Sequence, residues 1–133
     1  MEKKLYDTLP QEVERITAII FECAFKVHRA LGPGLLESVY EVCLCHELAK
    51  SGLKFRRQVE LPIIYDGVRL ESGFKIDILV EEQVIVELKA VETMIPLYEA
   101  QIMTYLKLTG KRLGLLINFN VPLLKNGIKR IIF

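Results

Sequence analysis

The sequence predicts an α/β fold in which a mixed β-sheet is flanked by helices, and three observations lead to this prediction. Hydrophobic residues recur at helical spacing in the first part of the chain, the middle part alternates with the period of strands, and a later amphipathic helix separates two apolar strands. The chain has 133 residues, of which 51% are hydrophobic. This length suits one domain with a substantial core, so we expect a single domain over residues 1–133.

Two helices are expected at the start of the chain. Thr8 and Gln11 fit a capping box around Pro10, and hydrophobic residues then recur at helical spacing as far as about Ala30. The Gly-Pro-Gly sequence at residues 32–34 ends this helix. A second helix is expected over residues 35–51, ahead of Gly52. Its predicted buried side consists of Leu36, Val39, Cys43 and Leu48.

Short strands follow the two helices. Asp66-Gly67 and Glu81-Glu82-Gln83 are turn sequences between alternating or apolar segments. Five strands are therefore expected before the next helix, over residues 55–61, 63–65, 68–71, 74–80 and 84–91. An amphipathic helix over residues 96–108 then leads to strands over 113–119 and 128–133. The predicted order is ααβββββαββ, with 113–119 parallel to 84–91 because a helix connects them.

The overall charge does not indicate a nucleic-acid-binding protein. Eighteen basic residues balance seventeen acidic ones, for a net charge of +1, so nucleic-acid contacts would have to come from local patches. The first residues do not resemble a signal peptide, and no apolar run is long enough to cross a bilayer. The three cysteines lack metal-site spacing and suit a reducing compartment. We therefore expect a cytoplasmic protein without membrane contacts.

Charged residues inside an apolar strand are the feature that most needs an explanation. Glu87 and Lys89 are two residues apart in "VIVELKAV", so both side chains leave the strand on the same face. Asp77 lies on the preceding strand, and a tight turn at residues 81–83 would bring it close to Glu87. Two neighbouring carboxylates repel, and a divalent cation such as Mg²⁺ removes that repulsion. A lysine beside the cation would hold a water molecule or a phosphate.

Two further pairs favour a site over the simpler alternative, which is a solvated strand face with a cross-strand ion pair. Glu37 shares a helical face with Tyr40 and would reach the carboxylates of the sheet. Gln101 and Tyr105 are four residues apart on the helix that follows the Glu-x-Lys strand. Alternatively, Glu37 is an ordinary exposed helix residue, and the Gln101–Tyr105 pair serves only in packing.

The sequence resembles a known family. Residues 34–40, Gly-Leu-Leu-Glu-Ser-Val-Tyr, match the signature of the GxxExxY proteins, and the similarity continues through "FKIDILVEEQVIVELKAVE", "EAQIMTYLKLTG" and "GLLINFNVPLLKNGIKR". This family resembles compact members of the PD-(D/E)XK nuclease superfamily, in its RecB-like branch. Ile76 replaces the proline of the superfamily motif, and Tyr98 stands where many relatives have histidine.

The resemblance implies a restriction-endonuclease-like core and a defined site. Asp77 and Glu87 would bind Mg²⁺ or Mn²⁺, and the catalytic residues would be Lys89, Glu37, Gln101 and Tyr105. The implied function is a metal-dependent phosphodiesterase that cleaves DNA or RNA with a metal-activated water. The alternatives are a catalytically silent nuclease-fold module that binds a protein partner or nucleic acid, and a structural domain with a buried ion-pair network. Because the chain is small, a homodimer or a protein partner would help to hold a substrate.

Overall fold

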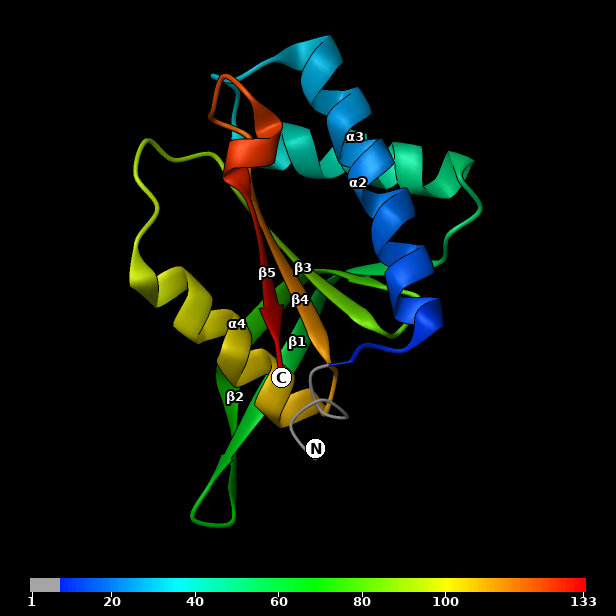
Figure 1. Ribbon diagram of the computed structural model, residues 1–133. Coiled ribbons are helices and arrows are strands. Elements are labelled where there is room, and N and C mark those ends of the chain that lie inside the picture. Colours follow the sequence, from blue (N-terminus) through cyan, green and yellow to red (C-terminus); the bar gives the residue numbers. More distant parts are fainter. Residues whose placement is uncertain (1–7) are drawn as a thin grey trace.

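The protein is a twisted five-stranded sheet with helices on both faces (Figure 1). The computed structural model describes residues 8–133, apart from the side chains of residues 71 and 72. The sheet order is β1-β2-β3-β4-β5, with β3 and β4 parallel and the other neighbours antiparallel. The elements are α2 (Gln11–Leu31), α3 (Glu37–Lys50), β1 (Phe55–Tyr65), β2 (Val68–Val80), β3 (Val84–Lys89), α4 (Pro96–Thr109), β4 (Leu113–Asn118), η1 (Leu124–Gly127) and β5 (Ile128–Ile132).

The two faces of the sheet carry separate hydrophobic cores. Alternate residues of β3 divide between them: Val84, Val86 and Leu88 pack under α2 and α3, whereas Ile85 packs under α4. Glu87 and Lys89 follow the alternation of Ile85 and so belong to the α4 face. The predicted α/β class, mixed sheet and parallel pairing of the strands around α4 are confirmed. No helix among residues 8–133 is long and apolar enough to cross a membrane.

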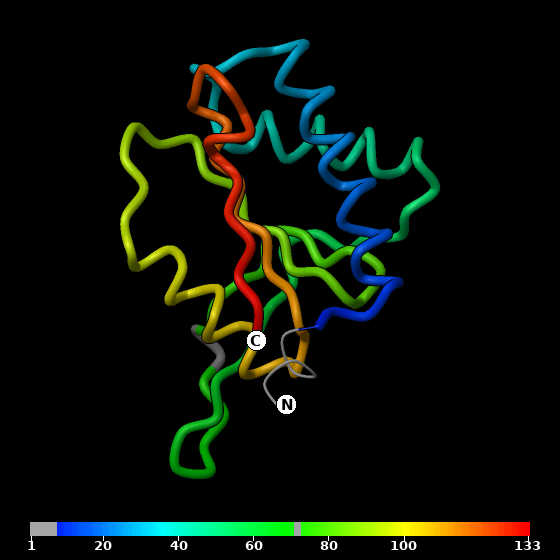
Figure 2. The backbone as a smooth tube through the Cα atoms, viewed as in Figure 1, coloured from blue at the N-terminus to red at the C-terminus, as the bar shows by residue number. Residues whose placement is uncertain are grey.

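The predicted division into five strands before α4 is wrong, because two predicted breaks lie within continuous strands. β1 runs through Pro62 and β2 runs through Gly73, with a register shift between Leu61 and Ile63. β1 is an edge strand, where a proline without an N–H is tolerated. A side chain at Gly73 would collide with the carbonyl oxygen of Leu61, so glycine permits the close approach of the two strands. The two strands form a long hairpin that projects from the body of the molecule (Figure 2).

Two details of the helices also differ from the predictions. Helix α2 begins at Gln11, and its N-cap residue is Pro10 and not Thr8 as predicted. In α3, Leu36 precedes the helix and is 74% exposed, and Val39 is exposed as well. Leu48 is buried as predicted, and the rest of the buried side of α3 is made by Tyr40, Glu41, Leu44 and Cys45. The prediction was wrong for Leu36 and Val39, because the buried face includes a glutamate, Glu41, that a hydrophobic pattern does not reveal.

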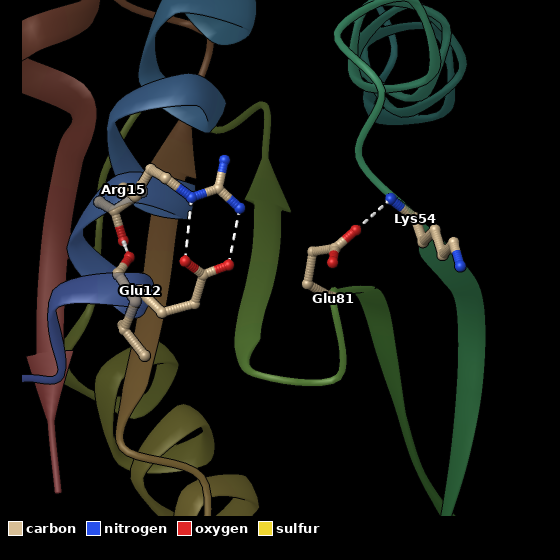
Figure 3. A network of polar contacts seen from close by, with 6 residues as sticks. Glu12, Arg15, Lys54 and Glu81 are labelled. Carbon is tan, nitrogen blue, oxygen red and sulfur yellow. Dashed lines mark hydrogen bonds and ion pairs between the residues drawn. The ribbon is translucent and has the colours of Figure 1, made fainter.

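The turn between β2 and β3 is tied to the start of β1 (Figure 3). Glu81 and Glu82 have φ values of 52° and 56°, which produce a tight reversal. The Glu81 carboxylate accepts a hydrogen bond of 2.5 Å from the backbone N–H of Lys54, and the Glu81 N–H donates to the Lys54 carbonyl. The turn pairs Val80 with Val84 and Ile78 with Val86. This register places Asp77 next to Glu87, as the turn sequence predicted.

Tyr40 connects α3 to the loop before it. Its side chain is fully buried, its ring stacks on Phe119 with centroids 4.5 Å apart, and its hydroxyl donates to the carbonyl of Gly32 at 2.6 Å. The same hydroxyl accepts a hydrogen bond from the N–H of Leu35 at 3.2 Å. Tyr40 therefore fixes the 32–35 loop, and with it the position of Glu37 at the start of α3.

We expect Tyr40→Phe to lower the free energy of unfolding by about 1–2 kcal/mol, because the Gly32 carbonyl and the Leu35 N–H lose their partner while the ring stack remains. Chemical denaturation of the two proteins measures this difference. Tyr65→Phe is the control, because Tyr65 is 73% exposed at the tip of the hairpin, and it should have no measurable effect. Equal stability of wild type and Tyr40→Phe would show that the two hydroxyl bonds do not hold the loop.

Candidate metal and phosphodiester site

Asp77 and Glu87 are joined by a reciprocal exchange of hydrogen bonds. The backbone N–H of Asp77 donates to Glu87 Oε1 at 3.0 Å, and the backbone N–H of Leu88 donates to Asp77 Oδ2 at 2.9 Å. The regular pairing of β2 with β3 stops one residue earlier, at Ile78 and Val86. The carboxylates thus take the place that main-chain carbonyls occupy in a regular sheet. Each is fixed in orientation by a backbone donor.

The ladder is also interrupted on the other side of Asp77. Arg57 pairs with Ile78 and Val59 pairs with Ile76, but Gln58 between them has a left-handed φ of 51°. Its side-chain amide donates to Glu41 Oε1 at 2.8 Å, and Arg57 donates twice to Glu41 Oε2. Both strands beside Asp77 therefore depart from regular pairing at its position. The local opening of the sheet leaves room for polar groups in an otherwise apolar layer.

Burial makes the acidic pair unfavourable when it is fully ionised. Burial, and then the charge of Asp77, raises the pKa of Glu87 to about 9, and Glu87 is only 7% exposed. Burial also raises the pKa of Asp77, although the hydrogen bond from the Leu88 N–H opposes the rise. Without a cation, Glu87 therefore keeps its proton at neutral pH.

The donor set fits a hard divalent cation. Two carboxylates that repel each other, each held by a backbone donor, match the one or two protein ligands that Mg²⁺ usually takes beside water and substrate phosphates. Within the described residues, no group of three or more histidine, cysteine, aspartate or glutamate side chains could hold a metal ion. A cation bound here would therefore keep most of its coordination positions for other ligands.

Lys89 lies at the end of β3, two residues after Glu87. Its ammonium nitrogen is 4.3 Å from the centroid of the Tyr98 ring, in the first turn of α4. Its backbone is held in register with Asn118 of β4, and its carbonyl accepts a hydrogen bond from the N–H of Phe119. Lys89 is therefore fixed at its backbone by the sheet and contacted at its side chain by α4.

Asn118 was not predicted as part of the site. It is 2% exposed and its side chain bonds both the N–H and the carbonyl of Val91, at 3.1 and 2.9 Å. This extends the contact between β3 and β4 past Lys89. The sequence contains one signal for Asn118, which is a polar residue at the end of an apolar strand.

Glu37 lies within electrostatic range of the site. Partial burial of its carboxyl raises the pKa of Glu37, Asp77 raises it further, and Lys89 lowers it. Glu41, one turn later, was not predicted; it is 7% exposed, and its charge also raises the pKa of Asp77. The spacing of Glu41 one turn after Glu37 was a signal, but an ion pair with Arg57 cannot be read from the sequence.

Tyr105 is a predicted site residue on α4, and the charges of the acidic pair act on it. It is 2% exposed, and its ring lies 5.7 Å from that of Phe74. Burial, followed by the charges of Glu87 and Asp77, raises the pKa of Tyr105 to about 12, so its hydroxyl remains protonated beside them. Gln101 is half-buried one turn earlier on α4. Among the described residues it forms no hydrogen bond to Asp77 or Glu87, so the structure does not join it to the pair.

We expect the stability of the metal-free protein to fall as pH rises from about 5 to 8. Glu87 keeps its proton in the folded protein up to a pKa of about 9 but loses it near 4.5 when unfolded. The folded state therefore binds more protons in this range, and the free energy of unfolding decreases with pH. Each unit of pKa difference corresponds to about 1.4 kcal/mol, so the slope is measurable by denaturation in the presence of EDTA.

Glu87→Gln should flatten this slope and stabilise the protein at pH 8, because the amide oxygen can still accept the Asp77 N–H without carrying a charge. Asp77→Asn should likewise leave folding intact or improved. Glu60→Gln, on the exposed part of β1, is the control and should keep the wild-type slope. A wild-type stability that rises over this pH range would contradict the proton on Glu87.

The geometry described above agrees with a comparison to known families. A family model described as the PD-(D/E)XK nuclease superfamily matches residues 14–131, which contain β1 to β4, nearly all of β5 and all the predicted site residues. Searches of curated proteins and of solved structures gave no match. The family match covers most of the chain and agrees with the mixed sheet and its flanking helices. The chain therefore belongs to the PD-(D/E)XK nuclease superfamily.

Proposed function

We propose that this protein is a metal-dependent phosphodiesterase that hydrolyses DNA or RNA with a metal-activated water. The observation that supports this most is the Asp77–Glu87 pair, in which backbone donors hold a buried and a half-buried carboxyl group together despite the repulsion of their charged forms. Such a position lowers the stability of the isolated protein and is typical of a functional site.

Asp77 and Glu87 would hold a divalent cation, Mg²⁺ or Mn²⁺, since members of this superfamily typically use divalent metals. When bound, the cation supplies a Lewis acid for a phosphate oxygen and a water of lowered pKa. Backbone hydrogen bonds fix the orientation of the two carboxylates, and the carboxylates would in turn fix the position of the cation. They also lose their mutual repulsion, because the positive charge favours ionisation of both.

The remaining residues act on water and phosphate. A protonated lysine has no lone pair, so Lys89 is not a ligand and instead donates hydrogen bonds to the attacking water or to the phosphate oxygens. The Tyr105 hydroxyl remains a hydrogen-bond donor beside the carboxylates. Glu37 and Gln101 complete the proposed site by resemblance to the RecB-like branch. Glu37, at the start of α3, is within electrostatic range of Asp77, and Gln101 precedes Tyr105 by one turn.

The partner of this site would be a nucleic acid. The chain supplies a single small domain, so we also propose that a homodimer or a protein partner adds to the grip on the substrate. The three cysteines, Cys23, Cys43 and Cys45, are all free thiols, which supports a cytoplasmic location. If the experiment below gives no activity, the alternative is a catalytically silent module that binds a protein partner or nucleic acid.

Lys89→Ala should abolish Mg²⁺- or Mn²⁺-dependent hydrolysis while leaving cation binding largely intact. Loss of one such electrostatic group typically costs about 10²–10³-fold in rate. A panel of single-stranded and duplex DNA and RNA measures the rate, and calorimetry measures cation affinity. Asp77→Ala and Glu87→Ala should instead lower the affinity itself.

Lys107→Ala is the matched control, because Lys107 is exposed on α4, and it should cleave as wild type does. If the wild type binds no divalent cation at millimolar concentration and cuts none of the substrates, the phosphodiesterase proposal is wrong. Cation binding without cleavage would favour the silent module.

A further inference from the structure

In the part of the chain that the structure describes, Lys89 forms no ion pair with the neighbouring carboxyl groups of Glu87, on its own strand, and Asp77, on β2. Glu87 is two residues away on the same strand face, and Asp77 is its hydrogen-bonded partner, yet Lys89 forms no ion pair with either among the described residues. Its ammonium lies over the Tyr98 ring instead, with the nitrogen 4.3 Å from the centroid. The charge of Lys89 lowers the pKa of both carboxyls, and a flexible lysine would otherwise be drawn to whichever of them is ionised.

We propose that Tyr98 is a positioning residue that keeps the Lys89 ammonium away from the Asp77–Glu87 pair. The inference rests on the proposed function in one respect, namely that the pair binds a divalent cation. The ring face is negative and attracts the ammonium without donating a lone pair or forming a fixed ion pair. The Lys89 ammonium thereby stays close to the site without occupying the oxygens that a cation needs.

Tyr98 is well placed for this task because α4 holds its ring rigidly. Pro96 begins the helix, and the Tyr98 N–H donates to the Ile95 carbonyl at 3.1 Å. The half-buried ring packs against the core under α4. The lysine backbone is fixed independently by β4, through the Phe119 N–H and the register with Asn118. Both partners of the contact are therefore anchored, and only the lysine stem is flexible.

The contact with Tyr98 keeps the Lys89 ammonium and a bound cation in separate parts of the site. With the ring present, the carboxylates remain available to a cation while the ammonium remains available to water or phosphate. Without the ring, the Lys89 ammonium would pair with the carboxylates. It would then compete with the divalent cation, because both are positively charged and bind the same oxygens. Loss of Tyr98 should therefore weaken cation binding, although Tyr98 is not itself a ligand.

A double-mutant cycle of Mn²⁺ binding by the full-length protein tests this. Tyr98→Leu should raise the Kd for Mn²⁺ by roughly five- to tenfold, the factor that one moderately strong cation–π contact is worth. Tyr98→Phe keeps the ring and should retain the wild-type Kd. In the Lys89→Met background, Tyr98→Leu should have no effect, because no ammonium is left to compete. Tyr65→Leu, at the tip of the hairpin, is the control for an exposed tyrosine.

A second measurement does not depend on the proposed function. In the metal-free protein with ¹³C-labelled lysines, the Lys89 side-chain signal, identified by its absence in Lys89→Met, should be shifted by the ring current of Tyr98. The shift should be lost in Tyr98→Leu and kept in Tyr98→Phe. If the wild type binds no Mn²⁺, the proposed function fails, and this spectrum alone decides whether Tyr98 positions Lys89.

Three results would overturn the inference. The first is a Lys89 signal that Tyr98→Leu leaves unchanged. The second is wild-type affinity for Mn²⁺ in Tyr98→Leu. The third is an effect of Tyr98→Leu that persists in the Lys89→Met background, since that effect would arise from disturbed packing and not from the ammonium.

Discussion

The exchange of hydrogen bonds between Asp77 and Glu87 is the constraint around which the other features of the site are arranged. Each carboxylate accepts an N–H from the opposite strand, so the strands remain joined where their regular ladder ends. The tight turn at Glu81-Glu82 sets the register that allows this exchange. A shift of one residue would send Asp77 to the other face and separate the pair.

Two cores support this strained position from both sides. The β3 residues Val86 and Leu88, which flank Glu87, are completely buried under α2 and α3, and Ile85 is buried under α4. Burial on both faces stabilises the strand and, for the same reason, denies the carboxylates solvent. The raised pKa of Glu87 is thus a direct result of the packing that makes β3 rigid. The same packing therefore fixes the position of the carboxylates and makes their ionisation unfavourable.

The sequence predicted what depends on local periodicity and turn chemistry. The pairing of Asp77 with Glu87 followed from the turn at residues 81–83, and the parallel strands followed from the helix between them. The failures depend on distant contacts. The sequence predicts strand ends at Pro62 and Gly73, but the strands continue, because the proline lies on an open sheet edge and the glycine lies against the Leu61 carbonyl. Glu41 was missed because only its partners, Arg57 and Gln58, make a buried carboxylate acceptable on that face of α3.

The placement of Lys89 bears on the choice between a functional site and a structural ion-pair network. A network that served stability would use the nearest cation to neutralise the buried carboxylates, because an uncompensated buried charge is costly. Lys89 is two residues from Glu87 and forms no such pair in the described structure; its ammonium lies over Tyr98, and a proton on Glu87 reduces the repulsion instead. The acidic pair is therefore relieved by a proton on Glu87 and not by an ion pair with the nearest lysine. A divalent cation could replace that proton, which is why we propose a metal site in preference to a structural network.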